Sequence, residues 1–488
     1  MAAVDVGVRS RVMRRLALVV VAFALAGCSS SSKSPGPSPN APGCTPPSAR
    51  VDWSSSVARL SSALRDGGYT VQKGVLRFFR VDDCKALDNC FGNNPSSPYG
   101  FYCLPPAPGG SEVPSLVDAI CPAGLKPTWQ LREDEAVVFL GRTAPTVRYL
   151  GFRSYVFSRR IASGARKDLF ASLGDSINQL NIASSGTACG GKGSAFDADT
   201  TVITTADRKL DALLRTKLDQ AGIPASIVNS DVIPRSVVKM GLDVDGDAFA
   251  MLYRVALFGD AAAGEAYLQG GDVTVLRITP KAATTIDPAP VPELKARGTG
   301  TTEADYQAAL GSLIDALAAK YAPAKIETTR MISIAPVGLE CLKTDVNCLG
   351  DNQDTLYIAS APNTIDAEKC FYVVAGVNHQ VSGKATYMNV SVYATKKIMG
   401  VGSVTDAQLS GSADALIADS PQKKALYAYA FKRDCGGEAH CFTIPSGAIG
   451  VPIGERMNFI MRPYLEAATR VAPDSGEIEM PYVLRVCP

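Results

Sequence analysis

Residues 16–28 read LALVVVAFALAGC, and this stretch decides the compartment, and so the redox conditions, in which the rest of the chain folds. Four arginines between residues 9 and 15 precede it, and its apolar run from residue 16 to residue 27 holds twelve residues. A helix needs about 20 apolar residues to cross a bilayer, so this run is too short for a transmembrane anchor. A basic segment followed by a short apolar run instead predicts a signal peptide over residues 1–27.

The end of the apolar run, Leu25-Ala26-Gly27-Cys28, resembles the lipobox of bacterial lipoproteins. This resemblance implies that the signal peptide is removed before Cys28 and that Cys28 then carries the lipid, palmitate included. The next residue, Ser29, is similar to that of lipoproteins not retained at the inner membrane. We therefore expect a lipid-anchored protein of the cell envelope, at the outer membrane or cell surface, whose anchor makes the membrane its partner.

The charge balance of the mature chain argues against one class of partner. Removing residues 1–27 takes away four arginines and Asp5, which changes the formal net charge from +2 to −1. Non-specific binding to phosphates needs a basic excess, so we expect no nucleic-acid partner.

The length of the mature chain predicts two lobes. Its 461 residues exceed the about 250 to 300 residues at which single cores stop growing. Residues 28–48 are rich in serine and proline, a composition that cannot bury a core and indicates an extended tether. Prolines and glycines concentrated in residues 280–301 indicate an interior boundary. We therefore expect an N-terminal lobe over 49–285 and a C-terminal lobe over 286–488.

The cysteines predict a disulfide-bonded body. The chain has thirteen, and if Cys28 carries lipid the other twelve can form up to six disulfides in an oxidising compartment. The candidate pairs closest in sequence are Cys84 with Cys90, Cys103 with Cys121, Cys341 with Cys348, and Cys435 with Cys441. The pairing of Cys44, Cys189, Cys370 and Cys487 stays open. The chain holds only two histidines, and the short cysteine spacings exceed those of zinc knuckles, so we expect no metal site and no cofactor.

Hydrophobic periodicity predicts an α+β fold, mostly antiparallel β-sheet with a few packed helices. Helical spacing of apolar residues occurs over 51–65, 210–218 and 302–321, and residues 197–234 read as a strand, a helix and a second strand. Alternating or continuous apolar runs predict strands, the clearest being 135–140, 148–160, 249–257, 273–278, 370–376, 387–394, 425–431, 457–464 and 482–486.

Two segments of the N-terminal half are candidate binding elements. Residues 91–100, FGNNPSSPYG, consist of turn-forming residues and indicate either a disulfide-stapled surface loop or a ligand-binding loop. On strand 148–160, one set of alternate residues is apolar, while the other includes Arg153 and Tyr155. Guanidinium and aromatic groups on one face suit a small-molecule or saccharide ligand, but an ordinary half-exposed strand with arginines over aromatics is the simpler interpretation.

The sharpest candidate site is GVNHQVSGKATY at residues 376–387. Residues 380–383 read as a hairpin turn, which would place His379 and Lys384 at two strand ends, with Asn378 and Tyr387 beside them. Histidine is the usual general base near neutral pH, and a lysine nearby can stabilise an oxyanion. A solvated hairpin tip accounts for the same residues, and no carboxylate lies beside His379 in sequence to orient it.

These patterns lead to two hypotheses. Residues 92–100, 147–159 and 376–387 are similar to uncharacterised secreted proteins, a resemblance that implies no activity. The first hypothesis is a cell-envelope lipoprotein that serves as a binding or structural module, with Arg153, Tyr155 and Asn378 as candidate binding residues. The alternative is an extracytoplasmic hydrolase that uses His379, with Lys384 and Tyr387 as weaker catalytic candidates.

Overall fold

The computed structural model describes residues 44–45, 49–110, 113–334, 336–365 and 370–488. The predicted signal peptide, Cys28 and most of the predicted tether lie outside these residues. Residues 37–488 form one compact unit. Within the described part of this unit, no helix is both long and apolar enough to cross a membrane.

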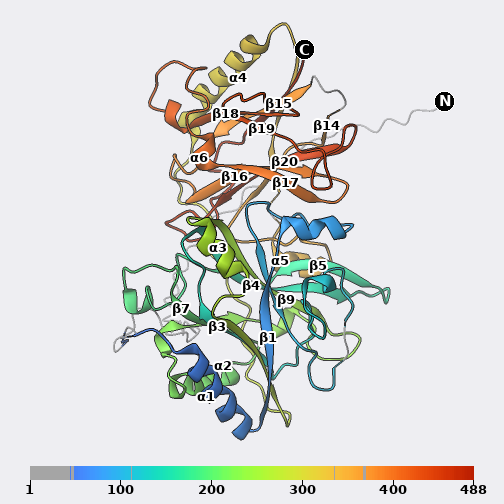
Figure 1. The fold of residues 1–488 in the computed structure, drawn as a ribbon, viewed down its shortest axis with the longest axis vertical. Helices are drawn as coiled ribbons and strands as arrows, with labels where there is room; N and C mark the ends of the chain where they lie inside the picture. The colour runs from blue at the N-terminus through green and yellow to red at the C-terminus, as the bar shows by residue number, and fades with distance from the viewer. Residues whose placement is uncertain (1–43, 46–48, 111–112, 335, 366–369) are drawn as a thin grey trace, which may run out of the picture. The chain divides into compact units, whose positions relative to one another are not determined.

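The fold is α+β and mostly antiparallel β-sheet, as the periodicity predicts (Figure 1). The N-terminal half builds a ten-stranded sheet in the order β5-β4-β9-β2-β1-β10-β3-β7-β8, with β6 paired to β4. Its strands are β1 (Tyr69–Phe79), β2 (Tyr99–Cys103), β3 (Ala136–Arg142), β4 (Val147–Arg160), β5 (Arg166–Ser172), β6 (Ile177–Asn178), β7 (Asp199–Thr205), β8 (Val228–Val232), β9 (Ala248–Phe258) and β10 (Val273–Pro280).

A β-α-β unit closes one edge of this sheet. Strands β7 and β8 pair in parallel, and α2 (Arg208–Gln220) connects them, which confirms the reading of residues 197–234. Asp207 caps α2 by accepting a hydrogen bond from the Lys209 amide (3.0 Å), and the leucines at its helical spacing are buried. The helices α1 (Trp53–Asp66) and α2 contribute to one apolar cluster with β3, β7 and β10, so they cover one face of the sheet.

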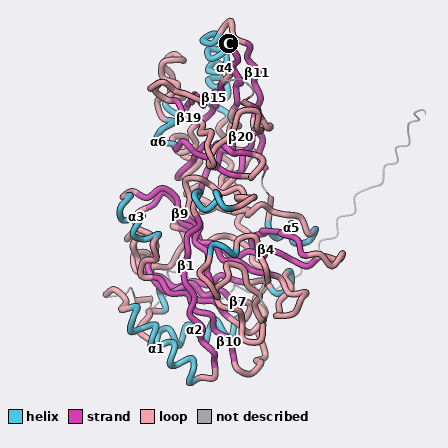
Figure 2. Tube along the Cα trace, turned by 45° about the vertical axis from the view of Figure 1, so that its right-hand side comes forward, coloured by secondary structure: helices cyan, strands magenta, loops and turns pink. Residues whose placement is uncertain are grey.

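The C-terminal half contains two further sheets. One has the order β11-β21-β15-β18-β19, and the other β12-β13-β20-β16-β17, with β14 paired to β20. Their strands are β11 (Lys325–Arg330), β12 (Ile332–Ile334), β13 (Tyr357–Ala359), β14 (Asn363–Thr364), β15 (Phe371–Val377), β16 (Tyr387–Ala394), β17 (Met399–Thr405), β18 (Leu426–Lys432), β19 (Cys441–Thr443), β20 (Arg456–Tyr464) and β21 (Tyr482–Cys487). Figure 2 shows strands running through the interior, with helices outside them.

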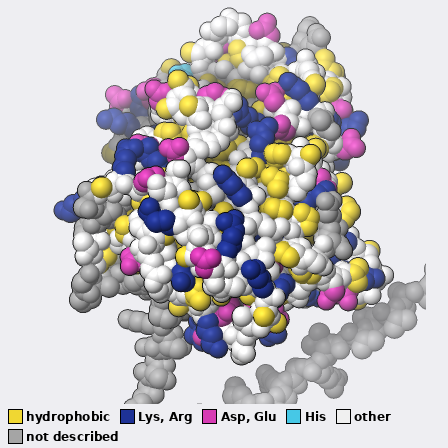
Figure 3. Space-filling model, turned by 60° about the horizontal axis from the view of Figure 1, so that its bottom comes forward, with side chains coloured by type: hydrophobic (Ala, Val, Ile, Leu, Met, Phe, Trp, Pro, Cys, Tyr) yellow, Lys and Arg dark blue, Asp and Glu magenta, His cyan; other side chains and the backbone are white. Residues whose placement is uncertain are grey.

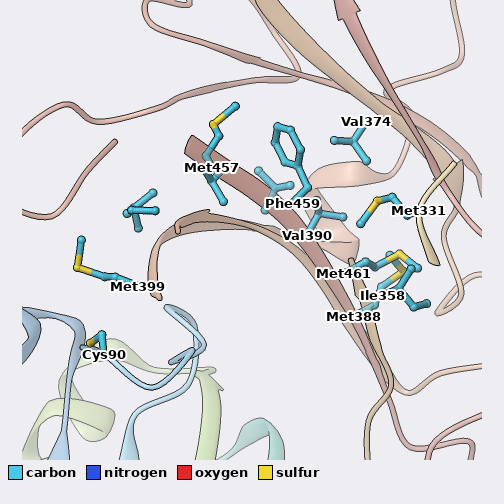
Figure 4. Close-up of a cluster of buried hydrophobic side chains, with 14 of the residues drawn as sticks. Cys90, Met331, Ile358, Val374, Met388, Val390, Met399, Met457, Phe459 and Met461 are labelled. Atoms are coloured by element: carbon cyan, nitrogen blue, oxygen red, sulfur yellow. The ribbon is translucent and has the colours of Figure 1, made fainter. Parts of the chain in front are cut away.

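The core between these two sheets is rich in methionine. Met331, Met388, Met399, Met457 and Met461 belong to one buried cluster, and Figure 4 shows them around the aromatic and branched side chains of the same cluster. Unbranched thioether side chains fill irregular gaps between sheets. The helix α4 (Gln307–Tyr321) covers the other face of the five-stranded sheet β11-β21-β15-β18-β19. Its buried leucines pack there on β15, β18 and β21. The remaining helices are short: α3 (Ala261–Leu268), α5 (Gly338–Thr344) and α6 (Asp406–Leu409).

The methionine-rich cluster also contains side chains from the ten-stranded sheet of the N-terminal half, among them Phe79, Phe157 and Leu252. One apolar core therefore includes residues from both sides of the predicted boundary at residue 286, and the division into two lobes stays a prediction. The predicted boundary segment is well anchored. Its Lys295 amide donates to Asp175 (3.0 Å), and its Thr299 amide donates to Glu477 (2.9 Å).

Six disulfides link the twelve cysteines of the body. The four pairs predicted from short spacing are present: Cys84–Cys90, Cys103–Cys121, Cys341–Cys348 and Cys435–Cys441. The pairing that the sequence left open is Cys44–Cys189 and Cys370–Cys487. On the face shown in Figure 3, basic and acidic side chains are both distributed over the surface.

Candidate functional site

His379 is not at a hairpin tip. Strand β15 pairs with β18 and β21, whereas β16 pairs with β17 and β20, so residues 378–386 pass from one sheet to the other. The expected hairpin is therefore wrong, because β15 and β16 belong to different sheets. His379 has no exposed surface at all.

A carboxylate does reach His379, but from 76 residues earlier in the chain. Glu303 Oε1 lies 2.9 Å from His379 Nδ1, and the Ser382 hydroxyl donates to the same oxygen. The other oxygen of Glu303 accepts a hydrogen bond from the Glu479 amide (2.8 Å). Burial by itself raises the pKa of Glu303, but the charge of His379 and these hydrogen bonds together bring it below its usual range. His379 Nε2 is buried without a hydrogen-bond partner.

Lys384 belongs to a separate ion cluster. Its Nζ donates to Glu466 Oε1 (2.9 Å), Glu477 Oε2 (2.6 Å) and Thr299 Oγ1 (3.2 Å). The hydrogen bond from Lys384 and that from the Thr299 amide lower the pKa of Glu477 to about 2. The three donors of the ammonium are thus already engaged, and Lys384 links the segment after residue 298 to the C-terminal sheets.

The other predicted site residues are buried in separate places. Asn378 Nδ2 donates to the Asp406 carbonyl (2.9 Å), and the Tyr387 hydroxyl accepts from Asn389 (3.0 Å). Arg153 pairs with the buried Asp231 (3.0 Å). No hydrogen bond or ion pair joins any two of Arg153, His379 and Tyr387 in the described structure. The predicted residues therefore do not form one surface.

The half-exposed face expected on β4 is also wrong. Its Arg153, Tyr155 and Phe157 are each at most 4% exposed. The physical reason is that both faces of β4 are covered: Leu150 and Phe152 pack into one apolar cluster, and Tyr155 and Phe157 into another. The Tyr155 hydroxyl donates to the Asp351 carbonyl (2.8 Å).

A pocket opens where this second face meets the C-terminal half, and we call it the arginine–aromatic pocket. Its outer part encloses about 500 Å³, and a narrow deep part adds about 30 Å³. Both parts are lined by Phe91, Gly92, Phe157, Phe170, Leu349, Tyr357 and Arg462. The deep part adds Arg254, Tyr99 and Phe101, and the outer part adds Ile334, Ile398, Ile460 and Asp168.

Arg254 reaches the deep part from the middle of β9, where it is 4% exposed. Its guanidinium donates to the Tyr155 hydroxyl and to the Gly350 carbonyl (3.1 Å). It also lies over the rings of Tyr99 and Tyr155, 5.5 and 5.1 Å from their centroids. Such cation–π contacts are favourable, but they leave the charge without a counter-ion.

Arg462 comes from β20 and is 3% exposed. It donates to the Tyr393 hydroxyl and to the Gly92 carbonyl (3.0 Å), and it lies 5.1 Å from the ring centroids of both Tyr357 and Tyr393. Among the described residues, neither Arg254 nor Arg462 has a carboxylate within ion-pair distance. The pocket therefore has two buried positive charges at its inner end.

Loop 91–100 contributes residues 91–93 and 99 to the pocket lining, and its residues are buried or half-buried throughout. Its Asn93 and Asn94 are at most 5% exposed. The Asn93 carbonyl accepts from the Tyr393 hydroxyl (2.7 Å), and Asn94 Nδ2 donates to the Tyr464 hydroxyl (3.1 Å). Phe91, Gly92 and Asn93 line the deep part, and ligand binding by this loop stays a prediction.

Sequence reasoning missed both pocket arginines. The signal was present: each lies inside an apolar strand, Arg254 in AFAMLYRVALF at 248–258 and Arg462 in RMNFIMRPY at 456–464, where the other arginine, Arg456, is exposed at the start of the strand. A charged residue in a buried strand needs a partner or a function.

A second buried polar cluster surrounds Asp354. Its two carboxyl oxygens lie 2.9 Å from the Tyr149 hydroxyl and from Asn178 Nδ2, and Asn352 Nδ2 donates to Tyr149 (3.0 Å). Burial raises the pKa of Asp354 to about 7, and the hydrogen bonds from Tyr149 and Asn178 offset this effect only in part. In the residues that the structure describes, no group of three or more His, Cys, Asp or Glu side chains is arranged to hold a metal ion.

Comparison with known proteins provides no family for this chain: no protein-family model matches it, and no curated protein has significant sequence similarity to it.

Proposed function

We propose that this protein is a lipid-anchored lipoprotein of the cell envelope that binds a small ligand in the arginine–aromatic pocket. The observation that carries the proposal is the pocket itself, about 500 Å³ in its outer part and ending at two buried arginines that have no carboxylate partner in the described part of the chain. Small-ligand pockets typically span about 300 to 1,000 Å³ and combine apolar walls with a few convergent polar groups.

The proposed location rests on the lipobox-like end of the apolar run at Cys28. The six disulfides support an oxidising compartment, in which such bonds form and persist. The serine- and proline-rich segment after Cys28 would hold the body away from the membrane.

Hydrolysis through His379 is not our proposal. Glu303 could orient the imidazole, as a catalytic histidine requires, but the fully buried side chain offers no surface to a substrate. A binding module needs only the pocket.

The test is to ask whether the pocket holds a small molecule in the protein purified from its own envelope. The lipidated protein is denatured, and the released compounds are identified by mass spectrometry. Ile334→Trp places a bulky ring at the pocket mouth, while Ile332→Trp is a matched control on the same strand outside the lining residues. We expect a compound to be released by the wild type and by Ile332→Trp and to be depleted at least about tenfold in Ile334→Trp, as for a ligand that loses its apolar contacts.

Equal recovery from both tryptophan variants would refute binding in this pocket. Recovery of no compound above the level of a mock purification, together with no binding of any probe described below, would refute the proposed function itself.

A further inference from the structure

We infer that the ligand of the arginine–aromatic pocket is an oxyanion with an apolar body, a carboxylate or phosphate monoester whose charged head pairs with Arg254 and Arg462. This inference rests on the proposed function and names the chemical class of its ligand.

The buried arginines of the described structure fall into two groups, those with and those without a carboxylate partner. Three in the ten-stranded sheet pair with buried carboxylates, and the ion pairs are Arg153–Asp231 (3.0 Å), Arg159–Asp247 (2.8 Å) and Arg277–Glu135 (3.1 Å). The two arginines without such a partner line the same pocket. A buried cation without a counter-ion is costly, so an anion that enters this pocket gains both charge pairing and hydrogen bonds.

Arg254 and Arg462 retain donors for such a ligand. Each guanidinium has five N–H groups, and each makes hydrogen bonds to one tyrosine hydroxyl and one backbone carbonyl. Asp351 is close enough to Arg254 to interact electrostatically, but its carboxylate already accepts hydrogen bonds from Ser172 and from the Gly338 amide. It therefore does not occupy the place of a ligand anion.

The walls of the arginine–aromatic pocket are mainly apolar. Phe157 packs against Phe91 and Phe170, with ring centroids 6.1 and 5.3 Å apart, so an aromatic wall leads from the outer part towards the arginines. At the mouth, Ile334, Leu349 and Ile398 are 40, 57 and 44% exposed, although single exposed apolar side chains need no explanation. Three of them at one opening indicate contact with an apolar ligand body.

The same lining opposes other ligand classes. A saccharide needs hydrogen-bonding partners along its whole ring, whereas the walls here are mainly aromatic and aliphatic. Asp168 is the one carboxylate among the described lining residues, and it lies in the outer part, away from the deep arginine. An anionic head is thus favoured at the inner end, with the apolar body towards the mouth.

The experiment measures binding to the full lipidated chain in phospholipid nanodiscs by calorimetry, with empty nanodiscs as the blank. The probes are phenylbutyrate, phenylethyl phosphate, phenylbutanol, phenylbutylamine and glucose. A hydrogen bond to a charged group contributes about 1.5 to 3 kcal/mol, so we expect at least one of the two anions to bind at least about tenfold more tightly than phenylbutanol. The amine, a cation, should bind more weakly than the alcohol.

Substitutions in the pocket test whether Arg254 and Arg462 cause the preference for the anionic probes. Arg254→Gln and Arg462→Gln should each remove most of the preference for the anion, while the surface control Arg65→Gln keeps it. If both glutamine variants unfold, Ile334→Trp at the mouth and its control Ile332→Trp outside the lining residues decide: only the first should weaken binding of the anion.

Equal binding of the alcohol and both anions would overturn the inference while leaving a ligand-binding pocket intact. Binding of glucose without binding of either anion would also overturn the inference and would still leave a ligand-binding pocket. Anion binding that is unchanged in Ile334→Trp would place the anion elsewhere and also overturn the inference.

Discussion

Replacing Asp354 with asparagine should change how the stability of the protein depends on pH. Asp354 is fully buried, and burial raises its pKa to about 7 from the ordinary 3.8. A carboxyl whose pKa is higher in the folded state favours folding at low pH, and this contribution is lost as the pH rises towards the folded pKa. At 1.36 kcal/mol per pKa unit, the full loss is about 4 kcal/mol.

Roughly 3 kcal/mol of this loss falls between pH 5 and pH 8, because ionisation of the unfolded chain is already under way at the lower value. Asparagine can keep the hydrogen bonds with Tyr149 and Asn178 but cannot ionise. Relative to the wild type, Asp354→Asn should therefore gain roughly 3 kcal/mol of stability from pH 5 to pH 8. For a body of this length that corresponds to roughly 3 °C in melting temperature.

Differential scanning calorimetry of both proteins at several pH values provides the test. The exposed carboxylate of Asp245, 73% accessible, supplies the control Asp245→Asn, which changes the net charge equally. A difference in melting temperature between Asp354→Asn and wild type that stays constant across this pH range would refute the reasoning.

Three further predictions follow from the structure and the sequence. His379→Ala should destabilise the protein by about 1 to 3 kcal/mol, because Glu303 loses its buried partner, whereas melting of the exposed-histidine control His440→Ala should match the wild type. Cys28→Ser should abolish metabolic labelling with palmitate and leave the signal peptide uncleaved; normal labelling would contradict the lipoprotein assignment. Non-reducing peptide mapping of envelope-purified protein should recover Cys341–Cys348 and Cys435–Cys441 as disulfides, and finding both pairs as free thiols would contradict the structure.

Local patterns were enough to predict most of the elements. The alternation over 148–160 corresponds to β4, and the leucine spacing after residue 207 corresponds to α2 with its parallel flanking strands. Three disulfides with sequence separations of 6, 7 and 6 residues were also predictable, because so short a loop keeps two cysteines close in any compact fold. The pair Cys103–Cys121, 18 residues apart, was predicted as a fourth. Periodicity and spacing act over a few residues, and the sequence displays them directly.

The position of the candidate site was not predictable in this way. Strands β15 and β16 follow each other and were expected to form a hairpin, yet each pairs within a different sheet. Glu303 meets His379 across 76 residues, and Arg254 and Arg462 line one pocket from strands of different sheets. Such contacts depend on the order of strands in three sheets and on which faces become covered.

The sequence by itself therefore determined the kinds of elements, their approximate limits and the cysteines that pair locally. Only the tertiary structure decided that His379 is enclosed, that both faces of β4 are buried, and that Arg254 and Arg462 have no carboxylate partner among the described residues. The physical reason is that burial and charge pairing are properties of what packs against a residue, and its neighbours in the chain do not specify them.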